Sequence, residues 1–313
     1  MTEPTAARQE QVAALGPFFA FETHPAASEL ASPWRTLSEV TQEESGVLRE
    51  RVTAVRASLA ARSGRPAEAV ELRVAASVAH LGLVARVLSP MLGLAALHGL
   101  CLPSRPPALD ELRWHSGLGG AFALSLPRET VASIAAGNAH SGSGSGSDSG
   151  SHSGSGSDSG SRAGSEAESH DGARTRPRVD TYACASPSAD ADTYTDTDAY
   201  ADADADAVEK LLDGPIRELV DAAAPFSVSL RILWGNVASA VNGASAGMVA
   251  AAPALARPAR TAALLFLSRP QLRDTHTLDP HNGRFRRRSC CLIYRAAPDA
   301  SGALCGDCVL ARP

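Results

Sequence analysis

Apolar and polar positions alternate at helical spacing along much of the chain. Residues 38–64 and 208–220 carry apolar side chains every three or four positions among charged ones, which predicts two amphipathic helices. Residues 66–88 are apolar on most of their surface, so we expect a helix there that lies in a core. Pro90 is expected to kink or end this helix, and a shorter helix over 91–97 would follow.

Strand patterns are short and few. Residues 109–128 contain brief apolar runs between glycines, and they predict a small sheet. Residues 227–233 predict another strand, and alanine-rich helices are expected over 233–252 and 254–267. The predicted fold class is α+β, predominantly helical with a small antiparallel sheet and a cysteine-rich C-terminal segment.

A low-complexity tract interrupts these patterns. Residues 139–207 are almost wholly Ser, Gly, Ala, Asp and Thr, and they cannot bury enough apolar surface to offset the entropy of ordering. The tract has a net charge of −9, whereas the other 244 residues carry +4. We therefore expect one domain in two parts, 1–138 and 208–281, with a disordered insertion over 139–207 and a cysteine-rich segment over 282–313.

Composition argues against several classes of function. Aromatic residues make up 4% of the chain and are not interleaved with basic ones, so no nucleic-acid surface is predicted. The most apolar stretch, residues 87–103, is too short and too broken to span a membrane, which needs about 20 residues. We find no secretory signal, so a cytoplasmic location is expected. Glycine-rich nucleotide loops are also missing from the sequence, so electrons for any redox reaction would come from a separate donor.

Four of the six cysteines lie close together near the C-terminus. Cys290 and Cys291 are adjacent, and Cys305 and Cys308 follow after 13 residues, which gives the pattern C-C-x13-C-x2-C. Four thiols within 19 residues, in a chain expected to stay in the cytoplasm, favour a metal or redox site over a disulfide framework. The C-x2-C turn lets both sulfurs face one centre, and Gly306 keeps side-chain bulk out of that turn.

The cysteines allow three interpretations. Structural zinc usually takes two C-x2-C pairs, and adjacent cysteines chelate one ion poorly because their side chains diverge. A 2Fe-2S cluster distributes its ligands over two irons, which suits an adjacent pair better. The pattern therefore favours a 2Fe-2S cluster on all four cysteines, with zinc and redox disulfides as the alternatives.

The C-terminal segment resembles the FhuF-like ferric-siderophore reductases. Their pattern is a basic pair, two adjacent cysteines, a Tyr-Arg and a closing CGDC; here residues 286–295 read RRRSCCLIYR, and CGDC follows. The family usually has ten residues between the cysteine pairs, so three additional residues, placed within 298–302, must loop out and leave the ligands in position. A weaker resemblance covers residues 71–97, the Trp114 segment and LWGN at 233–236.

This resemblance implies an activity. Family members are described as cytoplasmic iron-sulfur proteins that reduce hydroxamate-type ferric siderophores, so it implies a ferric siderophore as substrate. Because nucleotide loops are missing from the sequence, the expected electron donor is a separate protein such as a ferredoxin or a reductase. No catalytic residue is assigned beyond the four cluster ligands. The alternatives are an iron-sulfur sensor or electron-transfer protein that takes no siderophore, and a zinc-stapled interaction protein.

Other residues have both a functional and a structural interpretation. The basic run would either favour the reduced cluster and dock an acidic donor, or form a solvated face. Tyr294 would either pack over the cluster and limit water or be an ordinary half-buried tyrosine. The other candidates would either contact substrate or fill structural positions, with the two residues on the apolar helix forming a buried polar pair. The candidates are Arg286, Arg287, Arg288 and Arg295 in the basic run, and His80, Arg86, Trp234, Asn236 and Tyr294 elsewhere.

Overall fold

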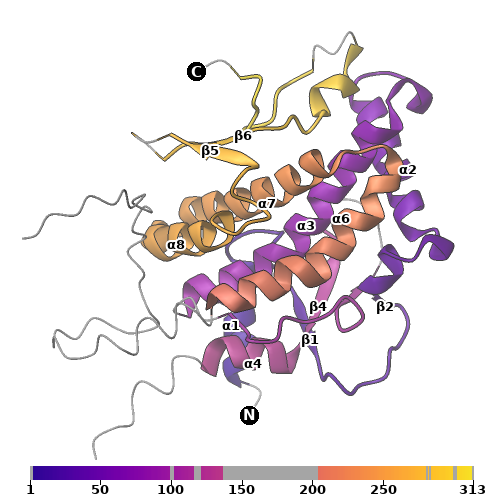
Figure 1. The fold of residues 1–313 in the computed structure, drawn as a ribbon. Helices are drawn as coiled ribbons and strands as arrows, with labels where there is room; N and C mark the ends of the chain where they lie inside the picture. The colour runs from indigo at the N-terminus through magenta and orange to yellow at the C-terminus, as the bar shows by residue number, and fades with distance from the viewer. Residues whose placement is uncertain are drawn as a thin grey trace, which may run out of the picture.

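A long helix, α3 (Leu72–Leu97), runs through the middle of the protein in the computed structural model (Figure 1). The structure describes residues 3–98, 102–115, 121–136, 204–279, 281, 283–298 and 302–311. Most of the low-complexity tract lies outside these ranges, as do Cys101 and Cys184, so the expected disorder of the tract stays a prediction.

Further helices surround α3, and short strands form two sheets. The helices are α1 (Glu3–Ala13), α2 (Val47–Arg62), α4 (Arg128–Ala136), α6 (Arg217–Ala223), α7 (Leu230–Ala251) and α8 (Ala256–Leu267). Residues 204–211 are helical and continue through a π-helical segment, Leu212–Ile216, into α6. The strands are β1 (Glu22–His24), β2 (Arg35–Thr36), β3 (Arg113–His115), β4 (Ala123–Pro127), β5 (His276–Leu278) and β6 (Phe285–Arg287). The predominantly helical α+β prediction is confirmed.

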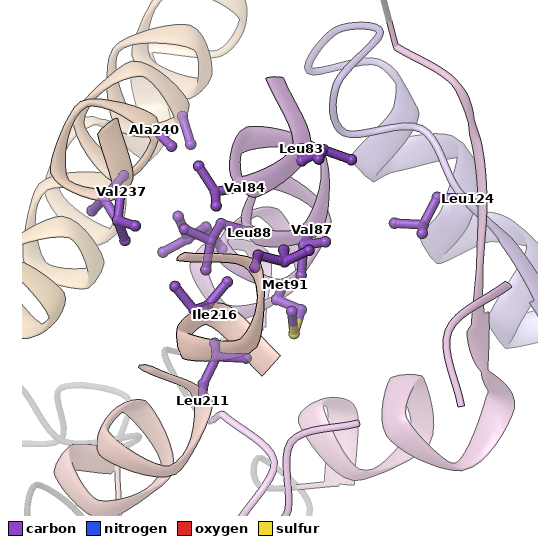
Figure 2. Packing of buried hydrophobic residues seen from close by; sticks show 14 of the residues in the cluster. Leu83, Val84, Val87, Leu88, Met91, Leu124, Leu211, Ile216, Val237 and Ala240 are labelled. Atoms are coloured by element: carbon purple, nitrogen blue, oxygen red, sulfur yellow. The ribbon is translucent and has the colours of Figure 1, made fainter. Parts of the chain in front are cut away.

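The hydrophobic core forms around α3. This helix packs along α7 and also contacts α2, α6 and α8. Figure 2 shows Leu88 of α3 beside Val237 and Ile216 on one side, and Leu83 directed toward Leu124 of β4 on the other. These side chains are all buried, and burying one Leu, Val or Ile contributes roughly 1.5–3 kcal/mol to stability. The expected core helix is therefore present.

Pro90 does not end α3, contrary to the expectation from sequence. The helix continues to Leu97, and the Ser89 hydroxyl donates a hydrogen bond to the Ala85 carbonyl at 2.7 Å. Proline removes one backbone hydrogen bond from a helix. Nearly every residue from Leu83 to Ala96 is buried, so packing on several sides of the helix outweighs that loss.

By length and composition α3 is the one helix in the described part of the chain that could cross a membrane. In this structure 78% of its apolar window is buried inside the protein. Core helices of soluble proteins have the same composition, so this property is weak evidence for a membrane span.

The first sheet has the strand order β1-β4-β3-β2. Strand β1 pairs with β4 in parallel, whereas the other two pairs are antiparallel, so this sheet is mixed and not antiparallel throughout as expected. Strands β5 and β6 form a separate antiparallel hairpin whose turn contains Gly283 at φ 68°. Figure 1 shows this hairpin and the C-terminal segment on the side of the helical layer away from the first sheet.

The strand expected over residues 227–233 is wrong. Ser227 has a left-handed conformation and Ser229 an extended one, and α7 begins at Leu230. The apolar residues after this point continue at helical spacing: Leu233, Val237 and Val241 are all buried where α7 packs on α3. The short apolar run is therefore the first turn of a helix, and the helical prediction for the residues that follow is confirmed.

Arg86 of α3 joins the N-terminal loop to the first sheet. Its Nε donates to the carbonyl of Phe122 at 2.7 Å and its Nη1 to that of Phe18 at 2.9 Å, while Nη2 donates to Ala20. The guanidinium is 2% exposed, and burial lowers its pKa to about 10, so it keeps its charge at neutral pH. Arg86 does not pair with His80, contrary to one sequence interpretation, because each residue has its own partners.

Replacing Arg86 with Met is expected to lower the free energy of unfolding by about 3 kcal/mol, because three buried carbonyls lose their donor. Urea denaturation followed by circular dichroism measures the change. Arg62→Met is the control, since Arg62 is exposed. Equal stability of the two variants would contradict the role of Arg86.

Candidate metal centre

The four cysteines lie in the irregular chain that follows the β5–β6 hairpin. All four are free thiols; Cys291 and Cys308 are buried, and Cys290 and Cys305 are half-buried. A turn at Gly283 leads into β6, which ends at Arg287, three residues before the first cysteine. The hairpin therefore fixes where the cysteine segment starts.

Local backbone geometry turns amide groups toward the sulfurs. Leu292 has a left-handed conformation at φ 70°, and its N–H donates to Sγ of Cys290 at 3.3 Å. In the CGDC segment the Cys308 N–H donates to the Cys305 carbonyl at 3.1 Å, and the Leu310 N–H donates to Sγ of Cys308 at 3.3 Å. Amide donors of this kind stabilise thiolates, which are the form that binds metal.

Helix α7 holds the CGDC turn in place. The carboxylate of Asp307 accepts hydrogen bonds from Ser239 Oγ at 3.0 Å and from Asn242 Nδ2 at 3.1 Å. The Asp307 carbonyl also accepts the N–H of Arg287 at 3.0 Å, which ties CGDC to β6. Sequence reasoning did not single out Asp307, Ser239 or Asn242, since nothing in their local pattern indicates that they meet.

Helix α3 holds the adjacent cysteine pair. Ser77 Oγ donates to the carbonyl of Cys291 at 2.9 Å, and Nδ2 of Asn236 donates to the carbonyl of Ser77 at 2.9 Å. Nδ2 of Asn236 also lies 3.4 Å from His80 Nδ1. Asn236 is fully buried inside α7, so it neither caps a helix nor lines a cleft, and it supports the Ser77 contact instead.

The glycine of LWGN allows the cysteine segment to lie directly on α7. A Cβ atom at Gly235 would be 2.4 Å from Ser289 Oγ and 2.9 Å from Arg287 Nη2. Both side chains bond to carbonyls of the preceding turn of the helix: Ser289 Oγ donates to Arg231 at 3.1 Å, and Arg287 Nη2 to Ile232 at 3.1 Å. Any larger residue at Gly235 would push these contacts apart.

The arginines of the basic run have different environments. Arg287 is 2% exposed, whereas Arg288 is exposed to solvent. Arg286 donates to the carbonyl of Ala311, and Arg295 pairs with Glu71 at 2.6 Å. The interpretation of the whole run as one solvated face is therefore wrong for Arg287.

The charge of Arg287 faces the thiols. Burial lowers the pKa of Arg287, and the negative charges of the cysteines and Asp307 oppose that shift. In the described part of the chain, Nε of Arg287 is buried and has no hydrogen-bond acceptor. The site therefore offers a buried cation and a spare donor to an anionic group.

Two thiols interact directly. The thiols of Cys291 and Cys305 are close enough to share a proton, which lowers the pKa of Cys291 and raises the pKa of Cys305. Burial raises the pKa of the Cys290 thiol. One sulfur from each cysteine pair is thus within hydrogen-bonding reach of the other pair, although 13 residues separate the pairs.

The chain between the two pairs forms a loop that is closed at its base. The Gly302 N–H donates to the Tyr294 carbonyl at 3.0 Å, and a Cβ atom at Gly302 would lie 2.6 Å from that oxygen. Tyr294 is half-buried in a short 3-10 turn, Ile293–Ala296. Of the residues expected to loop out, 299–301 lie outside the described ranges. The residues on either side of them meet, as an outward loop requires.

The donor set fits a 2Fe-2S cluster. Within the described residues no group of three or more His, Cys, Asp or Glu side chains is arranged to hold one metal ion. A two-iron cluster needs only two sulfurs at each iron, and its negative charge suits the buried Arg287 and the amide donors. These features define an iron-sulfur protein.

A comparison with known protein families also indicates a 2Fe-2S cluster in the cysteine segment. Residues 287–310 match the FhuF 2Fe-2S C-terminal domain, which confirms the resemblance in the cysteine segment and indicates a 2Fe-2S cluster. The match is confined to this segment. Curated proteins and solved structures gave no match to the chain.

Replacing Gly235 with Ala is expected to reduce cluster occupancy to less than about half, because the new methyl group displaces Ser289 and Arg287 from α7. Iron and sulfide analysis of anaerobically purified protein measures the loss. Gly243→Ala is the matched control on the same helix, since no atom lies within 4 Å of its added Cβ. Full occupancy in Gly235→Ala would show that the close approach is dispensable.

Proposed function

We propose that the protein is a ferric-siderophore reductase that acts in the cytoplasm on complexes of the hydroxamate type. The observation that carries this proposal is the match of residues 287–310 to the FhuF 2Fe-2S C-terminal domain, in a segment where Cys290, Cys291 and Cys305 face the buried cation of Arg287. We propose Cys290, Cys291, Cys305 and Cys308 as the cluster ligands.

The proposed reaction is a one-electron reduction. When bound, the 2Fe-2S cluster supplies single electrons. The substrate iron is Fe(III), which hydroxamate oxygens hold tightly, and the same hard donors hold Fe(II) far less tightly. Adding one electron to the complex therefore releases iron as Fe(II), and the protein's thiolates need no contact with the substrate iron.

The chain's own residues set the conditions for this electron transfer. Arg287 compensates the negative charge of the thiolates, and the N–H groups of Leu292 and Leu310 donate to two of the sulfurs. Burial of Cys291 and Cys308 keeps water away from one side of the centre, whereas half-buried Cys290 and Cys305 leave the other side near the surface. Electrons would enter and leave through this second side.

An external protein is the proposed electron donor. Arg288 and Arg231 are both exposed, and Arg231 Nη2 donates to the backbone carbonyl of Arg288 at 3.2 Å, so the charge of Arg231 lies beside the cysteine segment. A basic surface of this kind favours an acidic partner such as a ferredoxin or a reductase protein.

The decisive experiment reduces the anaerobically purified protein with dithionite, removes the excess, and adds a ferric trihydroxamate with an Fe(II) chelator. We expect a spin-half EPR signal that disappears as about one Fe(II) per cluster is released, because the cluster carries one electron. Serine variants of Cys290, Cys291, Cys305 and Cys308 should lose most of both signals.

Cys101→Ser and Cys184→Ser serve as controls for these variants, since both cysteines lie outside the C-C-x13-C-x2-C pattern. A reduced cluster that stays reduced in the presence of every ferric siderophore would reject the reductase and favour the sensor alternative. A colourless protein with bound zinc would reject the cluster as well.

Replacing Arg287 with Gln is expected to lower the midpoint potential of the cluster, because a buried positive charge beside the thiolates is lost. A lost interaction of about 1.4 kcal/mol corresponds to roughly 60 mV for one electron. Redox titration monitored by EPR measures the shift. Arg287→Lys keeps a positive charge and should lower the midpoint potential by less than Arg287→Gln does. The exposed control Arg288→Gln should leave the midpoint potential unchanged. Equal potentials in Arg287→Gln and Arg288→Gln would refute the role of the buried charge.

A further inference from the structure

A cleft of about 710 Å³ lies between the start of α2, the start of α3 and the end of α6. Its apolar lining includes Val40, Leu48, Leu72 and Phe226. Leu72 is 42% exposed, which is unusual for a leucine at a helix start and leaves apolar surface open to a ligand. Cleft volumes of roughly 300–1,000 Å³ are typical of sites for drug-sized molecules.

Both walls of the cleft continue into residues that hold the cysteines. On α3, Arg73 lines the cleft, and Ser77, which bonds to Cys291, follows one turn later, about 6 Å along the helix axis. On the other wall Ser227 lines the cleft, and Arg231, which accepts from Ser289, follows four residues later. The cleft therefore adjoins the adjacent cysteine pair.

A direct ion pair joins the cleft to the cysteine segment. Glu71 lines the cleft, and its Oε1 lies 2.6 Å from Nη2 of Arg295, four residues after Cys291. Oε2 of Glu71 pairs with Arg73 at 2.7 Å. A ligand in the cleft would thus be next to the segment that carries two of the proposed cluster ligands.

The charge of the cleft is negative. It is lined by four carboxylates and two guanidiniums, a net of −2: Glu43, Glu71, Glu218 and Asp221 against Arg49 and Arg73. The two arginines pair with Glu43 and Glu71. Among the described residues, no cation lies within ion-pair distance of Glu218 or Asp221, and both are exposed on α6. Their charge is therefore available to a ligand.

We propose that this cleft is the ferric-siderophore site and that Glu218 and Asp221 select complexes by charge. The inference rests on the proposed reductase function. A trihydroxamate complex of Fe(III) is neutral, and becomes monocationic when the ligand carries a free amine, whereas a tricatecholate complex is trianionic. Apolar lining suits the hydrocarbon spacers of a hydroxamate ligand, and the unpaired carboxylates attract its ammonium group and repel a trianion.

The test uses Ga(III) complexes, which have the charge and shape of the Fe(III) complexes but accept no electron. Calorimetric titration of the oxidised holoprotein should give affinity in the order monocationic trihydroxamate, neutral trihydroxamate, trianionic tricatecholate. Glu218→Gln combined with Asp221→Asn should weaken the monocationic complex about tenfold and change the neutral complex by less than about twofold.

Two further variants complete the design. Glu44→Gln combined with Glu50→Gln removes two exposed carboxylates that do not line the cleft, and should leave every affinity unchanged. Ala222→Trp places a large ring in the cleft, and should abolish binding of all three complexes while the visible spectrum of the cluster stays the same.

The outcomes separate this inference from the proposed function. If the cleft variants bind as the wild type does while the wild type still releases Fe(II) from Fe(III) complexes, the protein is a reductase and the cleft assignment is overturned. Equal wild-type affinity for the cationic and the trianionic complex would overturn the charge selection. If the wild type neither binds nor reduces any complex, the reductase proposal fails, and the inference fails with it.

Discussion

Arg287 carries a positive charge at a position that is almost completely removed from water. Such a charge is costly unless anionic groups surround it, and in this protein those groups are the thiols of two cysteine pairs and the carboxylate of Asp307. The surrounding contacts follow from this requirement. Gly235 gives the guanidinium room on α7, and the Ile232 carbonyl accepts one of its N–H groups. The cysteine segment and α7 therefore have to fold as one unit.

The two central helices, α3 and α7, hold the cysteine segment in a defined position although its own backbone is irregular. Ser77 of α3 bonds to the backbone of Cys291, and Asn236 of α7 supports Ser77. Ser239 of α7 bonds to the side chain of Asp307, so each cysteine pair is connected to an element of the core. Sites supported by packed helices are held more closely than sites on free loops. The burial of α3, which keeps it helical through Pro90, thus also serves the geometry of the metal centre.

The parts that local pattern determines could be predicted from the sequence. The helical class and the core character of α3 follow from spacing alone, because the helical period is visible along the chain. The four cysteines that we propose as ligands were likewise indicated by the C-C-x13-C-x2-C pattern. The supports of the centre could not be predicted, since Ser77 and Asp307 are ordinary residues until tertiary packing brings them to the cysteines. The parallel pairing of β1 with β4 is a long-range contact of the same kind. The sequence indicates LWGN as a motif, but only the structure shows that its glycine, Gly235, allows Ser289 and Arg287 to lie directly on α7.

The hydrogen bond from Gly302 to the Tyr294 carbonyl separates the length of the intervening loop from the position of the cysteines. Additional residues between Tyr294 and Gly302 would cost little, because loop entropy grows only slowly with length. Evolution can thus lengthen or shorten this stretch without rebuilding the centre. In this chain the close approach of Gly302, three positions before CGDC, fixes where the second cysteine pair begins, whatever the number of residues between the pairs.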